Sequence, residues 1–316
     1  MTQAKVAVVG GGSFGWGLAL AAERAGREVL MWSRRPQRDA TSKVTLVGSP
    51  AELAAADLVF FAVPSPVMPD LAAELGEHLS GAHFLVHVSR GIVGEELMTL
   101  SQVLRTRTPC RRVGALVGPL VAQALIDGAP GGGLVASRFP EVKDAVRDAL
   151  GGTRLRIYGT DDLVGAEFAA TAVGLLAMAV GFARGVGLGP ATLAVMATRG
   201  MAECARVGVH LGGRAETFAG LAGNGDLLAA VAGDDRPELA VGALLAGPAN
   251  NDPASATGKH GGAFIEGLAS ARRIAAYTKR HGLHAPLISL CADVFERKIS
   301  GLDAVKALMA RQVGEE

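Results

Sequence analysis

The stretch KVAVVGGGSFGWGLA, residues 5–19, decides the fold. It begins as a short apolar run rich in β-branched residues, passes through glycines and continues with residues that favour a helix. Gly10, Gly12 and Gly15 fit the spacing G-x-G-x-x-G. In that loop, glycine permits a sharp turn, backbone contact with a pyrophosphate and close packing of helix on strand. The stretch therefore predicts a dinucleotide-binding loop; the alternative is a glycine-rich turn between packed elements.

Outward from this stretch, apolar runs alternate with helical patterns up to about residue 160. Strands are predicted at 5–10, 28–33, 58–64, 83–89, 114–119, 132–137 and 155–159, and helices at 14–25, 51–57, 66–79 and near 140–150. Apolar strands separated by helices indicate a parallel sheet covered on both faces.

After residue 160 the strand pattern stops, and Asp161 and Asp162 make a good helix start. Long helical patterns follow at 190–208, 214–220, 237–246, 262–281 and 302–313. We therefore predict an α/β plus all-α chain. A dinucleotide-binding, Rossmann-type parallel-sheet domain covers 1–160, and a helical substrate domain covers 161–316.

Composition narrows the class of protein. The 316 residues are 49% hydrophobic with a formal net charge of +1, which indicates a globular chain with no nucleic acid partner. Cys110, Cys204 and Cys291 form no CxxC pair, so we expect reduced thiols and no metal site. The N-terminus lacks the features of a signal peptide, and we expect a cytoplasmic protein.

The uncharged run 168–183, FAATAVGLLAMAVGFA, is the stretch to weigh as a membrane span. Sixteen residues fall short of the roughly 20 that span a bilayer, so the run predicts a buried core helix and no membrane span. An apolar helical half suits a homodimer, and it suits a large core equally.

The end of the second strand bears on the choice of cofactor. An acidic residue there often binds the ribose 2′-hydroxyl of NAD, but this chain has Ser33, Arg34 and Arg35. A hydroxyl and two guanidiniums suit a 2′-phosphate, so we predict NADPH rather than NADH. The alternative is a solvated basic turn.

Segments along nearly the whole chain resemble the bacterial-type NAD(P)-dependent glycerol-3-phosphate dehydrogenases. They are GGGSFGWGLA (10–19), VPSPV (63–67), SRGI (89–92), VGP (117–119), YGTDDLVGAEF (158–168), TRGMAECARVGVHLGG (198–213), ETFAGLAGNGDL (216–227) and FIEGL (264–268). The resemblance implies a substrate bound between the two domains and hydride transfer to dihydroxyacetone phosphate, which gives glycerol 3-phosphate.

The resemblance also implies a set of cofactor-binding residues. The family's loop matches Gly10, Gly12, Ser13, Phe14 and Gly15; its basic residues on the adenosine side match Arg34 and Arg35; and its cofactor-contacting glutamate matches Glu266.

On the substrate side this chain departs from the family pattern. Arg90 stands where the family has the lysine of T-K-G, and Leu120 where it has the serine of G-P-S. Val173 stands at the position of the catalytic lysine, and Gly174 at that of the asparagine after it. Asp226 is retained, and the S-R-N trio falls on Arg236, Pro237 and Glu238. A one- or two-residue shift would recover Arg236 as the arginine. Valine can neither deliver a proton to an alkoxide nor stabilise its charge.

Arg90 and Asp226 are the residues we predict to act in catalysis. Arg90 follows an apolar strand, at the sheet edge where ligands bind, and its planar fork suits a carboxylate or phosphate. The alternative for Arg90 is a surface salt bridge. Asp226 enters a helix from a glycine-rich turn, where it either orients a base or caps the helix.

Five further residues are weaker candidates. Thr171 is expected to bond its own helix backbone, and His87 to be a satisfied strand histidine that could otherwise donate a proton. Lys259 and His260 lie in a glycine-rich segment and are expected to be solvated, unless Lys259 replaces the missing lysine. Glu266 either holds a ribose or caps its helix. Met178, Met196 and Met201 are expected to fill the core.

Three functions stay open at this point. The first is an active oxidoreductase that acts on a small anionic carbonyl or hydroxy compound other than dihydroxyacetone phosphate. The second is a catalytically silent relative that binds a dinucleotide and serves as a sensor or partner protein. The third is an ordinary glycerol-3-phosphate dehydrogenase that tolerates these changes.

Overall fold

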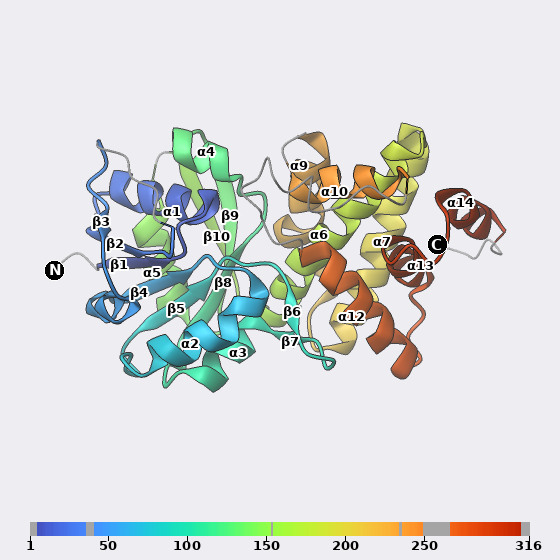
Figure 1. Cartoon of the computed structure of the whole chain (residues 1–316). Helices are drawn as coiled ribbons and strands as arrows, with labels where there is room; N and C mark the ends of the chain where they lie inside the picture. The colour runs from blue at the N-terminus through green and yellow to red at the C-terminus, as the bar shows by residue number, and fades with distance from the viewer. Residues whose placement is uncertain (1–4, 36–40, 153, 234–235, 249–265, 311–316) are drawn as a thin grey trace.

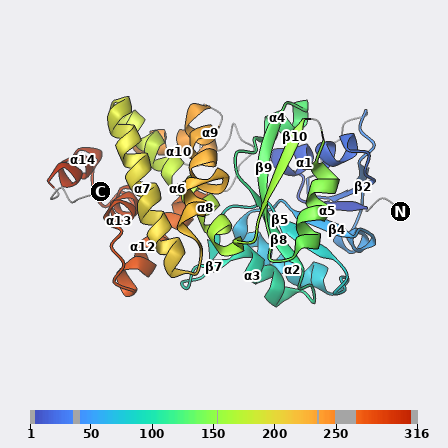
Figure 2. The ribbon, with the colours of Figure 1, turned by 180° about the vertical axis from the view of Figure 1, so that it is seen from behind.

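The computed structural model describes residues 5–35, 41–152, 154–233, 236–248 and 266–310. It has two parts side by side: a sheet with helices on both faces, and a bundle of helices (Figure 1). Seen from behind, β3 and α14 again lie at opposite ends of the molecule (Figure 2).

The sheet has eight strands in the order β10-β9-β8-β5-β4-β1-β2-β3. They are β1 (Val6–Val9), β2 (Val29–Trp32), β3 (Thr45–Leu46), β4 (Leu58–Phe61), β5 (Phe84–His87), β8 (Val113–Val117), β9 (Gly131–Ala136) and β10 (Leu155–Thr160). Every residue of β1, β4 and β8 is buried. This burial on both faces explains why these strands read as continuous apolar runs.

One pairing breaks the predicted parallel arrangement, because β9 runs antiparallel to β8. The connection between them contains only α4 (Ala122–Asp127), a helix of six residues. Such a helix is about 9 Å long and does not carry the chain back to the start of the sheet. The chain therefore reverses at the edge, and β10 then pairs parallel with β9.

Alternate strand residues enter two separate cores. Val6 and Val8 pack in one core with α1 (Ser13–Arg24) and α5 (Pro140–Leu150). Ala7 and Val9 belong to the other, with α2 (Met68–Gly76) and α3 (Leu100–Arg107). The second core continues into the helical part of the chain. The strand period of two thus joins one face of the sheet to the bundle.

Short elements complete the sheet part. They are the 3₁₀ helices η1 (Pro50–Ala55) and η2 (Ser65–Val67) and the hairpin strands β6 (Ile92–Val93) and β7 (Met98–Thr99). The pattern read as a helix at 51–57 is η1.

The centre of the bundle is α6 (Leu163–Gly185), whose N-cap is Asp162, as the sequence predicts. By length and composition this helix could cross a membrane, yet 94% of its most apolar window is buried inside the protein. Gly181 and Gly242 let it meet α10 (Pro237–Leu245) closely, since a Cβ on Gly242 would lie 2.8 Å from the Phe182 nitrogen. The expected core helix is confirmed, and it is longer than its uncharged run.

The remaining helices surround α6. They are α7 (Pro190–His210), α8 (Ala215–Ala219), the π-helical turn η3 (Leu221–Gly225), α9 (Asp226–Ala232), α12 (Glu266–Arg280), α13 (Pro286–Phe295) and α14 (Gly301–Met309). The predicted helices do not include α13, which is short and apolar. Its first N–H groups are capped from a distance, because the Glu203 carboxylate accepts bonds from Leu287 and Ile288 at 2.8–3.0 Å.

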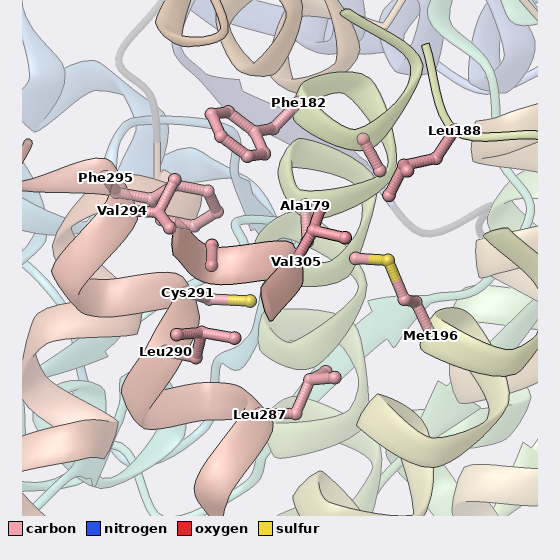
Figure 3. A pocket seen from close by; sticks show the side chains of 12 residues that line it. Ala179, Phe182, Leu188, Met196, Leu287, Leu290, Cys291, Val294, Phe295 and Val305 are labelled. Atoms are coloured by element: carbon pink, nitrogen blue, oxygen red, sulfur yellow. The ribbon is translucent and has the colours of Figure 1, made fainter. Parts of the chain in front are cut away.

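A cavity of about 30 Å³ lies inside the bundle between α6, α7, α13 and α14. Its walls are apolar side chains and one thiol, as Figure 3 shows; among them are Phe182, Met196, Leu287, Cys291 and Val305. A space of that size holds about one water molecule, and these walls offer water almost no polar partner. The lining therefore offers no group that would bind or orient an anionic substrate.

Candidate functional site

The glycine loop follows β1 directly, and two of its glycines are required by the fold. Gly10 has a φ of +108°, a conformation that a side chain would strain. A Cβ on Gly15 would run into the Gly10 carbonyl, so the start of α1 packs directly on the loop. Gly10 and Gly15 thus serve the turn and the packing of helix on strand.

Gly12 differs, because a Cβ built there would meet no atom of the chain within 4 Å. The first helical hydrogen bond of α1 runs from Trp16 to the Gly12 carbonyl, so the N–H groups of Ser13, Phe14 and Gly15 precede it. Open space above a glycine and unpaired N–H groups at a helix start suit a pyrophosphate. The loop therefore fits a dinucleotide.

The basic turn at the end of β2 lies beside this loop. The Ser33 hydroxyl accepts a hydrogen bond from the Arg35 N–H at 3.1 Å. A Cβ on Gly11 would lie 2.6 Å from the same hydroxyl oxygen, so the turn packs against the glycines. Arg34 and Arg35 are exposed. Their location suits contact with the adenosine end of a dinucleotide.

A cluster of three charged side chains joins the two parts of the chain. Arg90 follows β5, and its Nη2 lies 2.8 Å from Asp226 Oδ2 while its Nε lies 3.3 Å from the same oxygen. Arg236, just before α10, reaches Asp226 Oδ1 at 2.6 Å. Asp226 is fully buried. We call these three residues the arginine–aspartate cluster.

The cluster retains capacity for an anion. Burial lowers the pKa of Arg90, but Asp226 offsets this effect and the net shift is upward. The pKa of Arg236 is lowered by burial and by the nearby Arg90. Nη1 of either arginine makes no hydrogen bond within the described part of the chain, and the two side chains stay 22% and 13% exposed. Among the described residues, two guanidiniums thus share one buried carboxylate and keep N–H groups that have no partner there.

Asp226 does not cap a helix, so that alternative is wrong. It is the first residue of α9, and the N-cap position belongs to Gly225. The π-helical turn η3 precedes it and closes with a bond from the Gly225 N–H to the Gly220 carbonyl at 3.0 Å. Such turns are frequent at functional sites. Arg90 likewise pairs with a buried carboxylate and not with a surface partner.

Glu266 forms a second link between the two parts. Its carboxylate accepts bonds from the Ser65 backbone N–H at 2.7 Å and from the Ser65 hydroxyl at 2.6 Å. Burial raises the pKa of Glu266 to about 7, against the opposing effect of these bonds. A Cβ on Gly91, whose φ is +124°, would run into this carboxylate. Glu266 therefore lies at the same loop as Arg90.

The position that resembles the family's catalytic lysine lies in the core. Val173 is 1% exposed and belongs to the apolar cluster around α6. A Cβ on Gly174 would lie 3.9 Å from Oε1 of Glu238 and 3.7 Å from the Gly267 nitrogen. Glu238 is partly exposed and makes no hydrogen bond or ion pair with the described residues. A carboxylate thus approaches the place where the family pattern has an asparagine side chain.

The weaker candidates have other roles. His87 is a satisfied strand histidine, bonded to Glu167 at 2.7 Å and to the Ser89 carbonyl at 3.1 Å. Thr171 donates to its own backbone at Glu167, as expected, and also accepts from Gly91. Lys259 and His260 lie outside the described residues. Leu120 is a core side chain packed against Gly133, Met178 and Met201 are buried, and Met196 is partly so.

Two contacts were missed in the sequence analysis. Ser65 lies in the VPSPV segment but was not singled out, and its partner is 201 residues away. The pairing of Arg236 with Asp226 spans ten residues, in a segment where only the resemblance to the family's S-R-N trio points to a site. The available signal was a proline-rich turn directly after a buried strand, at the sheet edge where ligands bind.

The fold and the glycine loop define a Rossmann-fold oxidoreductase with a helical second part. The model of the NAD-dependent glycerol-3-phosphate dehydrogenase N-terminus matches residues 5–46 and 40–142, and that of the C-terminus matches 162–306. The chain belongs to this family, which uses NAD(P)H.

Individual relatives agree. The glycerol-3-phosphate dehydrogenase [NAD(P)+] of Synechococcus elongatus is 33% identical over 100% of this chain and 99% of its own, and that of Moorella thermoacetica is 33% identical over 97% and 96%. The fold also matches the glycerol-3-phosphate dehydrogenase of Coxiella burnetii, with a TM-score of 0.86, 24% identity and coverage of 98% and 99%.

Proposed function

We propose that this chain transfers hydride between NAD(P)H and a small anionic carbonyl compound whose anion binds to the arginine–aspartate cluster. The relatives carry the name glycerol-3-phosphate dehydrogenase, so dihydroxyacetone phosphate is one candidate substrate. The observation that carries the proposal is the pair of partly exposed guanidiniums on one buried carboxylate. The proposal makes Arg90 and Asp226 the acting residues and NADPH the preferred reduced cofactor.

The proposed work of the cluster is binding and charge stabilisation. When bound, NAD(P)H supplies the hydride. Asp226 holds Arg90 and Arg236 in fixed positions, and their free N–H groups bind and orient the substrate anion. Val173 supplies no proton, so stabilisation of the developing alkoxide falls to the fixed guanidinium charges, and solvent water supplies the proton that completes the alcohol.

We further propose that the preferred anion is a carboxylate. Glu238 lies near Gly174 and within electrostatic range of both arginines. Its negative charge opposes a phosphate dianion more strongly than a carboxylate with a single charge. The planar arginine fork matches a carboxylate equally well. An asparagine at this place, as in the family pattern, would not repel phosphate.

We also propose the domain boundaries and the residues that contact the 2′-phosphate. The end of β10 at Thr160 and the start of α6 at Leu163 support a division into domains 1–160 and 161–316. The exposed Arg34 and Arg35 beside Ser33 support contact with a 2′-phosphate.

The test is NADPH oxidation at high enzyme concentration, with dihydroxyacetone phosphate and with a panel of small 2-oxo acids. The wild type is expected to turn over an oxo acid faster than dihydroxyacetone phosphate. The variant Glu238→Asn is expected to shift the kcat/KM ratio toward the phosphate by about tenfold or more, because it removes a repulsive charge from the site. Adding Val173→Lys to Glu238→Asn should raise phosphate turnover further.

Arg90→Gln tests the role of the cluster, and Arg105→Gln is its matched control. The first removes a cluster member and should abolish turnover while NADPH still binds, whereas Arg105 is exposed on α3 and its change should have no effect. Faster turnover of dihydroxyacetone phosphate in the wild type would overturn the carboxylate preference and leave an ordinary glycerol-3-phosphate dehydrogenase. NADPH binding without turnover on any substrate would favour the silent sensor.

A further inference from the structure

The described residues contain one fully buried ion-pairing group that the proposed chemistry does not use. His87, the last residue of β5, and Glu167, in α6, are 1% and 3% exposed. His87 Nε2 lies 2.7 Å from Glu167 Oε1. The carboxylate also accepts from the Ser101 N–H at 2.8 Å and from the Ser101 hydroxyl at 2.5 Å. Four polar groups from three elements thus satisfy one another in the core.

The bonding partners determine where the hydrogens of this group lie. His87 Nδ1 lies 3.1 Å from the Ser89 carbonyl, which can only accept, so Nδ1 carries a hydrogen. Nε2 faces a carboxyl oxygen of Glu167. Glu167 therefore holds the ring with Nε2 toward the carboxylate and with the Nδ1–H toward Ser89.

The bond to Ser89 matters because Arg90 is the next residue. The Ser89 hydroxyl donates to the Val63 carbonyl at 2.5 Å. On the other side of Arg90, the Gly91 N–H donates to Thr171 Oγ1 at 3.2 Å, and Thr171 in turn donates to the Glu167 carbonyl at 3.0 Å. Both neighbours of Arg90 are thus fixed, and each connects to Glu167 through two hydrogen bonds.

We propose that His87, held by Glu167, is a positioning residue that fixes the Ser89–Gly91 backbone and so the place of the Arg90 guanidinium. The inference rests on the proposed function, in which Arg90 binds the substrate anion. It assigns His87 and Glu167 a role in positioning the residue that binds the substrate. A histidine that only filled the core would need no donor to Ser89.

Two substitutions separate the two bonds of His87. In His87→Asn the amide can replace Nδ1 and donate to Ser89, but it is too short to reach Glu167. In His87→Gln the amide can reach Glu167 in place of Nε2, but the bond to Ser89 is lost. His83→Gln is the control, since His83 precedes the same strand and bonds to Ser80 and Ala54.

The first measurement is amide hydrogen exchange over residues 88–92, because it needs no substrate. His87→Gln is expected to raise exchange there by about 3–10-fold, the worth of one hydrogen bond, while His87→Asn and His83→Gln leave it near the wild-type rate. The second measurement is kinetic, with whichever substrate of the panel the wild type turns over. His87→Gln should raise KM with little change in the dissociation constant for NADPH, and His87→Asn should keep more of the wild-type KM.

Equal exchange in wild type and His87→Gln would overturn the positioning role. The role would also be overturned if KM rose in parallel with a loss of stability in both His87→Gln and His87→Asn. If no substrate is turned over, the proposed function fails while the exchange result still decides this inference, so the two failures are distinguishable.

Discussion

The glycine loop and the arginine–aspartate cluster are built in opposite ways. The loop lies within a few consecutive residues and presents backbone, with Gly10 and Gly15 set by conformation and packing. The cluster consists of side chains, and Arg90 and Asp226 are 136 residues apart. The loop presents groups that every residue has, and the cluster presents groups that a single substitution replaces.

The comparison explains which half of the family pattern this chain keeps. A loop made of glycine backbone tolerates almost no change, because a Cβ at Gly10 or Gly15 meets main-chain atoms. A cluster of side chains changes its chemistry one residue at a time without loss of the fold. Val173 and Gly174 pack into a sound core although the pattern has a lysine and an asparagine there.

The largest effect is expected from Asp226→Asn. The change leaves Arg90 and Arg236 close together without the buried carboxylate that both contact. Breaking a buried pair by removal of one partner costs about 3–5 kcal/mol. Urea unfolding should show a loss of that order, while NADPH binding by the folded fraction stays near the wild-type value because the loop is separate.

The control for this prediction is Asp144→Asn. Asp144 pairs with Arg147 in an exposed i,i+3 bridge and should cost less than about 1 kcal/mol. A similar loss in both variants would contradict the view that the cluster holds the two parts together.

Glu266→Gln tests the other link between the parts. Burial raises the pKa of Glu266 from 4.5 to about 7 in the folded state, so the folded state binds the proton more tightly than the unfolded state. This contribution is fully present below pH 4.5 and is lost as the pH rises through about 7, with a total of at most about 3 kcal/mol. Unfolding free energies measured from pH 4 to 8 should show this fall in the wild type and not in the variant. Glu141→Gln, at an exposed site on α5, serves as the control, and parallel pH curves for wild type and Glu266→Gln would show that burial does not govern this group.

The sequence predicts more of the fold than of the site. The strand and helix periods place most of the sheet and the bundle, since apolar burial acts through local periodicity. The direction of β9 was missed because it depends on the length of α4. Glu266 was expected to hold a ribose or cap a helix, and its bond to Ser65 joins residues too far apart for any local signal. The same holds for His87 and Glu167.

Two glycine substitutions separate the loop's contribution to folding stability from its contribution to cofactor binding. Gly15→Ala places a methyl group against the Gly10 carbonyl and should cost about 1–3 kcal/mol of folding stability. Gly12→Ala meets only open space, so thermal unfolding should stay within about 0.5 kcal/mol of the wild type. The dissociation constant for NADPH, measured by fluorescence titration, should nevertheless rise about tenfold or more in Gly12→Ala, because the methyl group occupies the ligand's space. An unchanged dissociation constant would mean that the open space at Gly12 is not where the pyrophosphate lies.

The smallest effect is expected from Arg34→Ala, which sharpens the comparison at the adenosine end. Arg34 is exposed, so its contact with a 2′-phosphate is screened by water and contributes about 1 kcal/mol, close to a fivefold change in affinity. The loss should fall on NADPH and leave NADH nearly unchanged, since only NADPH carries the phosphate. Titrations with both cofactors at low and at high salt measure this, with Arg105→Ala as the matched exposed arginine. The preference should shrink as salt rises, because an exposed ion pair weakens with ionic strength. Equal affinities of Arg34→Ala and wild type for NADPH would identify the turn as a solvated basic surface. The backbone of the loop would then bind the cofactor without help from this side chain.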